Sequence, residues 1–225
     1  NLLAKNPDYI WVPHLSELYV NDEEEYRIDF CSTCVFVCAE PYFLKQAFKD
    51  HQLDGRMIHP NLIMASGYDS EQDKFVESAK QMGITDEDKI REAHRYAADL
   101  QIQYQDELFK IGEDFLKFLE ENPDEFAMVL VGRPYNAFTD FANKGIPRKF
   151  ASRGIHVLPY DIFDYRDESV DDNMYWEGGK KILKVAKVIK RHPQLFATYV
   201  SNFSCGPDSL IVPKFRKIMG TKPSL

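Results

Sequence analysis

The sequence predicts an α/β protein, and three observations support this fold class. Short apolar runs alternate with amphipathic segments in the first and last thirds of the chain, and a long segment between them has apolar residues at steps of three or four. A chain of 225 residues buries roughly 70% of its extended surface, enough for one large or two small domains. We therefore expect two Rossmann-like parallel-sheet lobes joined by a long helix: a partial lobe at 1–85, a connector at 86–121 and a second lobe at 122–225.

The first lobe is predicted to alternate strands and helices. A helix is favoured after Pro41, because proline is accepted in the first helical turn, and Gly83 is typical of a residue that ends one. Pro60 is expected to interrupt a strand, since it has no N–H to donate to a sheet. The predicted strands lie at 9–12 and 57–64, and the predicted helices at 41–49 and 70–82.

The connector is predicted to be one continuous helix. Residues 85–88 resemble a capping box, and Asn122 with Pro123 ends the pattern. Gly112 is a position where the helix could bend. A stripe of this kind is typical of core or interdomain packing, and its residues are Ile90, Ala93, Ala97, Leu100, Tyr104, Leu108, Ile111, Phe115 and Phe118.

The second lobe repeats a strand followed by a helix three times, which favours a parallel sheet with right-handed crossovers. The expected strands are 126–131, 155–158 and 196–200, and the expected helices are 139–152, 174–191 and 208–219. Ligands in such sheets bind beyond the carboxyl ends of the strands. Two unusual loops, 132–136 and 202–208, fall on that rim, so we expect them to be near neighbours.

Cys205 is the most suggestive residue on this rim. Gly206 permits a sharp turn and Pro207 suits the first helical position, so Cys205 is placed beside free helix N–H groups. Their partial positive charge favours a thiolate, which attacks electrophiles or binds metal. A turn cysteine without a role is the alternative. Arg133, on the other loop, could pair with a phosphate or carboxylate or hold neighbouring loops together.

The other three cysteines, Cys31, Cys34 and Cys38, lie close together in CxxC and CxxxC spacing. Several of their thiolates could reach one centre, so zinc and an iron–sulfur cluster are both open. A zinc finger is only partly matched, because the second histidine comes too late in the sequence. The alternative for Cys31 and Cys38 is use as small hydrophobic residues.

Composition and charge exclude several classes of function. A net charge of -8 argues against a nucleic-acid partner, which requires clustered Lys and Arg. No apolar run approaches the roughly 20 residues of a membrane span, and the four cysteines do not show the spread of a secreted disulfide framework. We expect reduced cysteines in an intracellular protein. Because residue 1 is Asn rather than Met, the chain is expected to be a piece of a longer polypeptide.

Four motifs in the last third form a recognisable series: Val131-Gly132-Arg133-Pro134-Tyr135-Asn136, Lys144-Gly145-Ile146-Pro147, Asn173-Met174-Tyr175-Trp176 and Asn202-Phe203-Ser204-Cys205-Gly206-Pro207-Asp208. Together with residues 8–14 and 34–41 they resemble the acyl-CoA dehydratase activase-related proteins, relatives of the 2-hydroxyglutaryl-CoA dehydratase and benzoyl-CoA reductase subunits. The similarity spans nearly the whole chain.

This resemblance implies a cytoplasmic system of anaerobic bacteria, in which an ATP-driven activator passes electrons to an iron–sulfur centre in acyl-CoA chemistry. By motif match, Cys34 and Cys205 are the implied ligands, with Cys38 and Cys31 as further thiolates and Arg133 and Asn202 as cofactor-binding residues. The implied partners are an ATP-dependent activator domain or a dehydratase subunit, and an acyl-CoA.

The sequence also departs from this family. Val35 and Cys38 replace the usual proline and glutamine, and further family motifs are expected before residue 1 and after residue 225. The chain alone is thus expected to hold an incomplete cluster site, or none, unless Cys31 or Cys38 supplies a thiolate. A scaffold or docking module that has kept the fold and lost the cluster is the alternative function.

Overall fold

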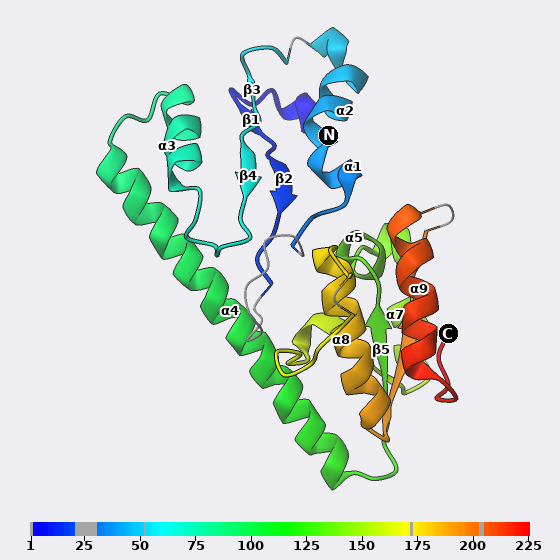
Figure 1. The fold of residues 1–225 in the computed structure, drawn as a ribbon. Helices are drawn as coiled ribbons and strands as arrows, with labels where there is room; N and C mark the ends of the chain where they lie inside the picture. The colour runs from blue at the N-terminus through cyan, green and yellow to red at the C-terminus, as the bar shows by residue number, and fades with distance from the viewer. Residues whose placement is uncertain (1, 21–30, 52, 172, 203–204) are drawn as a thin grey trace. The chain divides into compact units, whose positions relative to one another are not determined.

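The structure is a computed structural model that describes residues 2–20, 31–51, 53–171, 173–202 and 205–225. The described residues form two compact units, the first made of 2–20 and 31–102 and the second of 103–225. Both units combine helices with parallel strands, and one long helix runs from the first unit into the second (Figure 1). The predicted α/β class, with its long helix, is confirmed.

The first unit contains β1 (Ile10–Trp11), β2 (His14–Glu17), α1 (Val35–Cys38), α2 (Glu40–Ala47), β3 (Met57–Ile58), β4 (Asn61–Ile63), α3 (Gln72–Gln81) and the start of α4 (Glu87–Glu121). The second unit contains the rest of α4, then β5 (Ala127–Val131), α5 (Pro134–Ala137), α6 (Asp140–Asn143), α7 (Ile146–Ala151), β6 (His156–Pro159), α8 (Glu177–Arg191), β7 (Leu195–Tyr199) and α9 (Gly206–Met219). Short 3-10 turns occur at Leu3–Lys5, Lys49–His51 and Tyr160–Ile162.

Two pairs of parallel strands form the sheets of the first unit. β1 pairs with β3 so that Ile10 lies opposite Met57, and β2 pairs with β4 so that His14 lies opposite Asn61. The interruption expected at Pro60 therefore separates β3 from β4. β2 was not predicted, because its sequence His-Leu-Ser-Glu lacks the apolar character that marks a buried strand.

Helix α3 and the start of α4 pack together through aromatic side chains. The rings of Phe75 and His94 lie 4.3 Å apart between centroids, and Trp11 of β1 lies 5.8 Å from Phe75. The imidazole of His94 is only 9% exposed. Its pKa lies below the ordinary value of 6.5, because burial disfavours the charged imidazolium, whereas the carboxylate of Asp69 acts weakly in the opposite sense.

The buried His94 predicts a loss of stability in mild acid. At pH values below 6.5 the unfolded chain binds a proton that folded His94 does not, so the free energy of unfolding falls until the pH passes below the folded pKa. Urea unfolding at pH 7.5 and 5.5 should show a smaller loss for His94→Phe than for the unaltered chain. His192, whose pKa burial also lowers, supplies part of the remaining loss. Equal losses in the two proteins would contradict the prediction.

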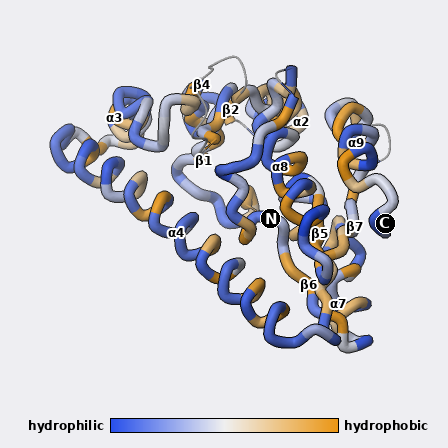
Figure 2. The backbone as a smooth tube through the Cα atoms, turned by 60° about the horizontal axis from the view of Figure 1, so that its bottom comes forward, coloured by the Kyte–Doolittle hydropathy of each residue, from blue (hydrophilic) through white to orange (hydrophobic). Residues whose placement is uncertain are grey.

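The second unit contains a three-stranded parallel sheet, as predicted from the sequence, and the strand order in the structure is β6-β5-β7. Ala127 of the central strand lies opposite His156 on one side and Leu195 on the other. Helix α7 packs against β6, while α8 packs against β7 and α9. Figure 2 shows that these strands are among the most apolar parts of the unit. Its fully buried residues include Val129, Val131, Ile182, Val185, Ile189, Leu195, Ile211 and Phe215.

One expectation for the second unit was wrong. Residues 139–152 form α6 and α7 rather than one helix, because Lys144 and Gly145 adopt left-handed backbone angles of φ 55° and 70° between them. Gly179 is buried in α8. A Cβ atom added there would lie 2.8 Å from the sulfur of Met174, so a larger residue would require the Met174 side chain to shift.

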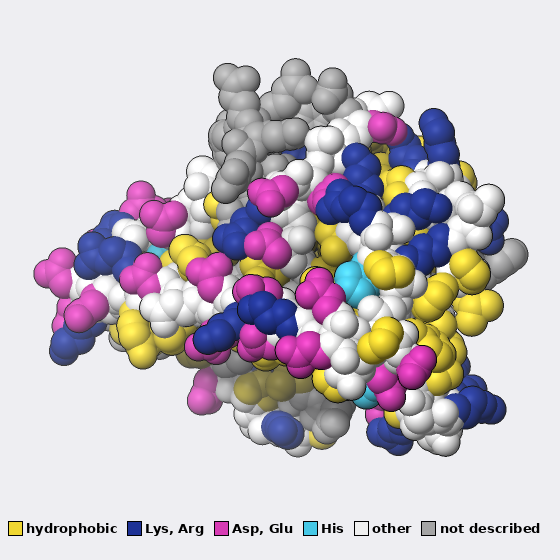
Figure 3. Space-filling view, turned by 90° about the horizontal axis from the view of Figure 1, so that it is seen from below, with side chains coloured by type: hydrophobic (Ala, Val, Ile, Leu, Met, Phe, Trp, Pro, Cys, Tyr) yellow, Lys and Arg dark blue, Asp and Glu magenta, His cyan; other side chains and the backbone are white. Residues whose placement is uncertain are grey.

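Helix α4 is continuous through Gly112 and ends at Glu121, close to the predicted limits. The Gln194 side chain caps its end by donating to the carbonyl oxygens of Leu119 and Asn122, at 2.7 and 2.9 Å. Acidic and basic side chains are interspersed over the face of the molecule seen in Figure 3. On α4, Glu113 pairs with Lys117 at 2.8 Å. Within the described residues, no helix combines the length and apolar character needed to cross a membrane.

Candidate functional site

The candidate site lies where β5 and β7 end at the same edge of the sheet. The backbone N–H of Val200 donates to the carbonyl of Val131 at 2.7 Å, so the two strands stay together past their last paired residues. Gly132 makes this possible, because its φ of 147° is unfavourable for other residues and an added Cβ would lie 2.4 Å from the oxygen of Val200. The loops that follow the two strands therefore begin in contact.

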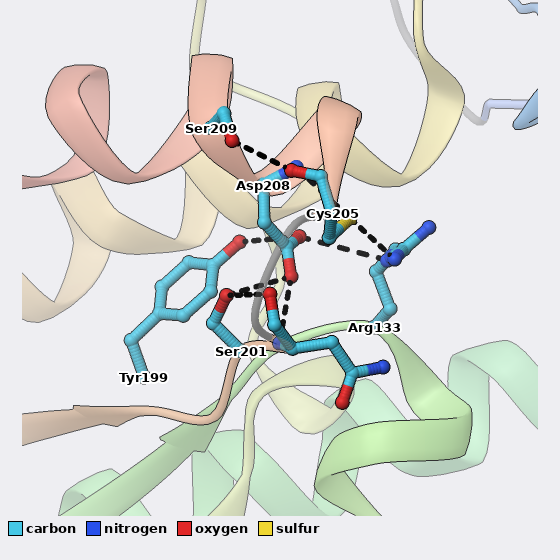
Figure 4. Close-up of polar contacts among 7 residues, drawn as sticks. Arg133, Tyr199, Ser201, Cys205, Asp208 and Ser209 are labelled. Carbon is cyan, nitrogen blue, oxygen red and sulfur yellow. Dashed lines mark hydrogen bonds and ion pairs between the residues drawn. The ribbon is translucent and has the colours of Figure 1, made fainter.

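Arg133 and Cys205 meet across these loops. The Nη2 atom of Arg133 donates to the sulfur of Cys205 at 2.6 Å, and the guanidinium also lies over the ring of Tyr135, 4.8 Å from its centre. Cys205 is the N-cap of α9, and its sulfur accepts a second hydrogen bond from the backbone N–H of Asp208 at 3.3 Å. The sequence-based prediction that the two loops are neighbours is confirmed (Figure 4).

Asp208 connects the parts of this site, although no role was predicted for it. Its carboxylate is 2% exposed and lies 3.5 Å from Nε of Arg133. The hydroxyl groups of Ser201 and Tyr199 donate to its two oxygens at 2.9 and 3.3 Å (Figure 4). A buried carboxylate requires this kind of pairing to remain charged. Asp208 therefore fixes Arg133 in position beside Cys205.

The electrostatic surroundings of Cys205 differ from the expectation of a favoured thiolate. Burial is the largest effect and raises the pKa of the thiol, and the negative charge of Asp208 adds to this rise. The Asp208 N–H and the Arg133 guanidinium act in the opposite direction but do not outweigh burial. The expected helix N–H donor is thus present, and Cys205 nevertheless remains a thiol at neutral pH.

Asn202, predicted as a cofactor-binding residue, lies beside this cluster. Its backbone N–H donates to a carboxylate oxygen of Asp208 at 3.4 Å. The side chain itself is exposed. Residues 203 and 204 of the same motif lie outside the described residues. Asn202 and Arg133 therefore belong to one site, in which Arg133 is the more deeply buried side chain.

The three other cysteines lie in the first unit, on a segment that is hydrogen-bonded to β2 and to the residue that follows it. Cys34 is the N-cap of α1, and Cys38 is the last residue of that helix. Thr33 donates through its backbone N–H to the oxygen of Ser16 at 3.0 Å, and Leu18 donates to the oxygen of Cys31 at 2.9 Å. Cys31 is buried, whereas Cys34 and Cys38 are partly exposed, so the latter two are the accessible thiols of this segment.

His14 contacts the backbone of Cys38, and His59 contacts His14. Nδ1 of His14 lies 2.8 Å from the carbonyl oxygen of Cys38, which can only accept, so this nitrogen carries the proton. In a neutral His14, Nε2 then accepts from Nδ1 of His59 at 3.3 Å. The hydroxyl of Ser16 lies 3.4 Å from the sulfur of Cys38. The partner of His14 is a backbone carbonyl, which no residue type reveals, so the sequence alone does not show this contact.

In the described part of the chain, none of the four cysteines forms a disulfide bond. Among the described residues, no three His, Cys, Asp or Glu side chains converge in a way that could hold a metal ion. Cys34 belongs to the first unit and Cys205 to the second, so their shared site stays a prediction.

The fold and this site define an α/β protein with a cysteine and an arginine at the carboxyl edge of a parallel sheet. The family described as "CoA enzyme activase uncharacterised domain" matches residues 1–163, and the chain belongs to this family. No curated protein and no solved structure matches the chain. The match includes Cys31, Cys34, Cys38 and Arg133, while Cys205 lies beyond it. The resemblance to activase-related proteins is confirmed at the level of the family.

Proposed function

We propose that the protein supplies Cys205 and Cys34 as ligands of an iron–sulfur cluster that serves electron transfer in acyl-CoA dehydration or reduction. One observation supports this most strongly: the sulfur of Cys205 receives N–H donors from Arg133 and from the first turn of α9. Donors of this kind, directed at a thiolate, tune the potential of cysteine-bound clusters. Membership of the CoA enzyme activase family gives independent support.

The residues around Cys205 fit such a ligand. Binding to iron requires loss of the thiol proton, and the guanidinium of Arg133 at 2.6 Å offsets the negative charge that then forms on sulfur. Asp208 keeps the guanidinium in place, and Ser201 and Tyr199 keep Asp208 in place. When bound, the cluster supplies the one-electron chemistry. The protein's contribution is to position the ligand, tune its electrostatics and limit solvent access.

In the first unit, Cys34 is the preferred ligand and Cys38 the second. Cys34 is partly exposed at the start of α1, whereas Cys31 is buried at 5% exposure. The contacts of Cys38 with Ser16 and His14 give its side chain and backbone fixed positions. The partners that accompany this function are an ATP-dependent activator or a dehydratase subunit, together with an acyl-CoA.

Anaerobic reconstitution with iron and sulfide tests the proposal. The unaltered chain should gain bound iron, acid-labile sulfide and a broad visible absorption, and Cys205→Ala and Cys34→Ala should each lose most of all three. Removing a ligand breaks the cluster site, whereas Ser209→Ala, which removes only a hydroxyl that donates to the carbonyl of Cys205, should keep the iron. Iron content unchanged in Cys205→Ala would refute the role given to Cys205.

A scaffold or docking module is the second candidate, and a specific observation favours it: no three metal-ligating side chains converge among the described residues. Substitutions distinguish the two functions: Arg133→Gln tests the cluster, and the cysteine variants test the scaffold. If a cluster is bound, loss of a charged donor to sulfur should make its reduction potential more negative while iron remains bound. If the protein is a scaffold, neither cysteine variant should alter electron transfer by the complete activator system.

A further inference from the structure

The first unit contains an open pocket between α3 and the start of α4, separate from every residue discussed above as a cluster ligand. Its volume is about 520 Å³, within the usual range of small-molecule sites. Both helices lie side by side along this part of the chain (Figure 1). The residues that matter here are Trp11, Phe75, Met82, Ile84, Ile90 and His94.

The wall of the pocket is mainly apolar and partly open to solvent. Trp11 is 39% exposed and Ile84 is 51% exposed, although both line the pocket. Trp11, Phe75 and His94 form a continuous row of rings, with centroids 5.8 and 4.3 Å apart. A contiguous apolar surface of this kind is typical of a site that a ligand covers. An apolar molecule in the pocket would bury these side chains.

His94 adds one polar group to this wall. Its Nδ1 atom is buried and has no hydrogen-bond partner among the described residues. Nε2 has no hydrogen-bond partner in the described part of the chain and is not one of its buried unpaired atoms, so this nitrogen keeps some exposure. A neutral imidazole carries one N–H, and a buried unpaired donor is less tolerated than a buried unpaired acceptor. The proton therefore belongs on Nε2, where it is a donor available to a ligand.

The charges around the pocket are balanced. Lys89 pairs with Asp86 at 3.2 Å, and Arg91 pairs with Asp73 at 2.6 Å. Asp69 acts electrostatically on His94 and would repel an anion near it. A carboxylate would thus find no unopposed cation among the described residues that line the pocket, whereas a neutral oxygen acceptor needs only the N–H of His94.

From these observations we propose that the pocket binds a small uncharged organic molecule, with an apolar body of about ten non-hydrogen atoms and one carbonyl or hydroxyl oxygen. The apolar body lies on Trp11, Phe75 and Ile90, and the oxygen accepts from Nε2 of His94. This site is independent of the cluster proposed above, since none of the described residues that line it is a cysteine.

Fluorescence of Trp11 tests the proposal directly, because this residue is part of the wall. In the whole chain carrying Trp176→Phe, Trp11 is the only tryptophan, since the sequence holds two. Titration with 2-octanone should shift its emission to shorter wavelength and reach saturation. Octanoate, which has the same chain length and a negative charge, should bind at least tenfold more weakly. Absence of a saturable shift with 2-octanone, or equal binding of octanoate, would overturn the proposal.

Two variants and one control locate the ligand. Ala93→Phe places a ring in the pocket from an exposed helix position and should abolish binding. His94→Phe keeps an aromatic ring beside Phe75 but lacks the donor, so 2-octanone should bind about tenfold more weakly. Ala47→Phe, at an exposed position of α2 outside the pocket, should bind normally. Unchanged binding in Ala93→Phe would disprove the location.

A second copy of the chain is the other occupant that the experiment must exclude. Sedimentation of the unliganded protein should give the same oligomeric state for the unaltered chain and for Ala93→Phe. A dimer that Ala93→Phe dissociates would show that another chain covers the pocket, and the small-molecule proposal would be wrong.

Discussion

Replacing Arg133 with alanine is expected to lower the free energy of unfolding of the second unit by about 3 kcal/mol. The carboxylate of Asp208 is 2% exposed, and Arg133 is its paired cation at 3.5 Å. Without the guanidinium, the buried charge keeps only neutral donors such as the hydroxyls of Ser201 and Tyr199. Neutral hydrogen bonds do not offset the cost of burying a charge as a cation does. Urea unfolding followed by circular dichroism measures the change.

Arg148→Ala is the matched control for this prediction. Arg148 pairs with Asp140 at the surface, where the two side chains are 79% and 62% exposed. Exposed ion pairs contribute between about 0 and 1 kcal/mol, so the control should differ from the unaltered chain by about 0.5 kcal/mol or less. Similar losses of unfolding free energy in Arg133→Ala and Arg148→Ala would show that the buried charge of Asp208 does not need Arg133 as its cation.

The proximity of Arg133 and Cys205 could be predicted from the sequence, whereas the role of Asp208 could not. Neighbouring parallel strands end at the same edge, so residues after two such strands meet whatever their identity. An Asp in the first turn of a helix is also common for a separate reason, since it interacts well with the helix dipole. Its burial and its pairing with Arg133 depend on the packing of α9, which the local sequence does not specify.

The long helix shows a similar limit. Its existence and ends follow from local signals, which explains the agreement between the predicted connector at 86–121 and α4 at Glu87–Glu121. The buried face was predicted less well: Leu100, Tyr104 and Ile111 are 44–57% exposed, while the buried positions include Ala98, Phe109 and Leu119. Periodicity indicates that one face is apolar, but small residues such as Ala98 can be buried where a larger neighbour is not.

The failure at residues 139–152 had a signal in the sequence. Gly145 followed by Pro147 is the pattern of a helix start, with glycine in a left-handed conformation at the N-cap and proline in the first turn. The apolar spacing across this pattern was compatible with one helix. The left-handed backbone at Gly145 and the proline that follows it instead end one helix and start another. Turn chemistry was the stronger evidence here, because a proline within a helix costs about 3 kcal/mol.

Gly112→Ala is expected to destabilise the second unit by about 2 to 3 kcal/mol, although alanine is the better helix former. An added Cβ at this position of α4 would lie 2.0 Å from the backbone oxygen of Ile162 and 2.9 Å from its carbonyl carbon. Ile162 is 4% exposed and the following Phe163 is 1% exposed, so this backbone cannot move away without disturbing the core. A fall in the urea midpoint of unfolding would report the clash.

Gly178→Ala separates this clash from helix propensity. Gly178 lies in the first turn of α8, and an added Cβ there would have no atom within 4 Å. The same substitution should therefore stabilise the protein by about 0.5 kcal/mol, because alanine loses less conformational freedom on folding. The change in the free energy of unfolding should therefore have opposite signs in the two variants, since of these two glycines Gly112 alone lies against a second segment of backbone. If Gly112→Ala were neutral or stabilising, the close approach of α4 to Ile162 would be wrong.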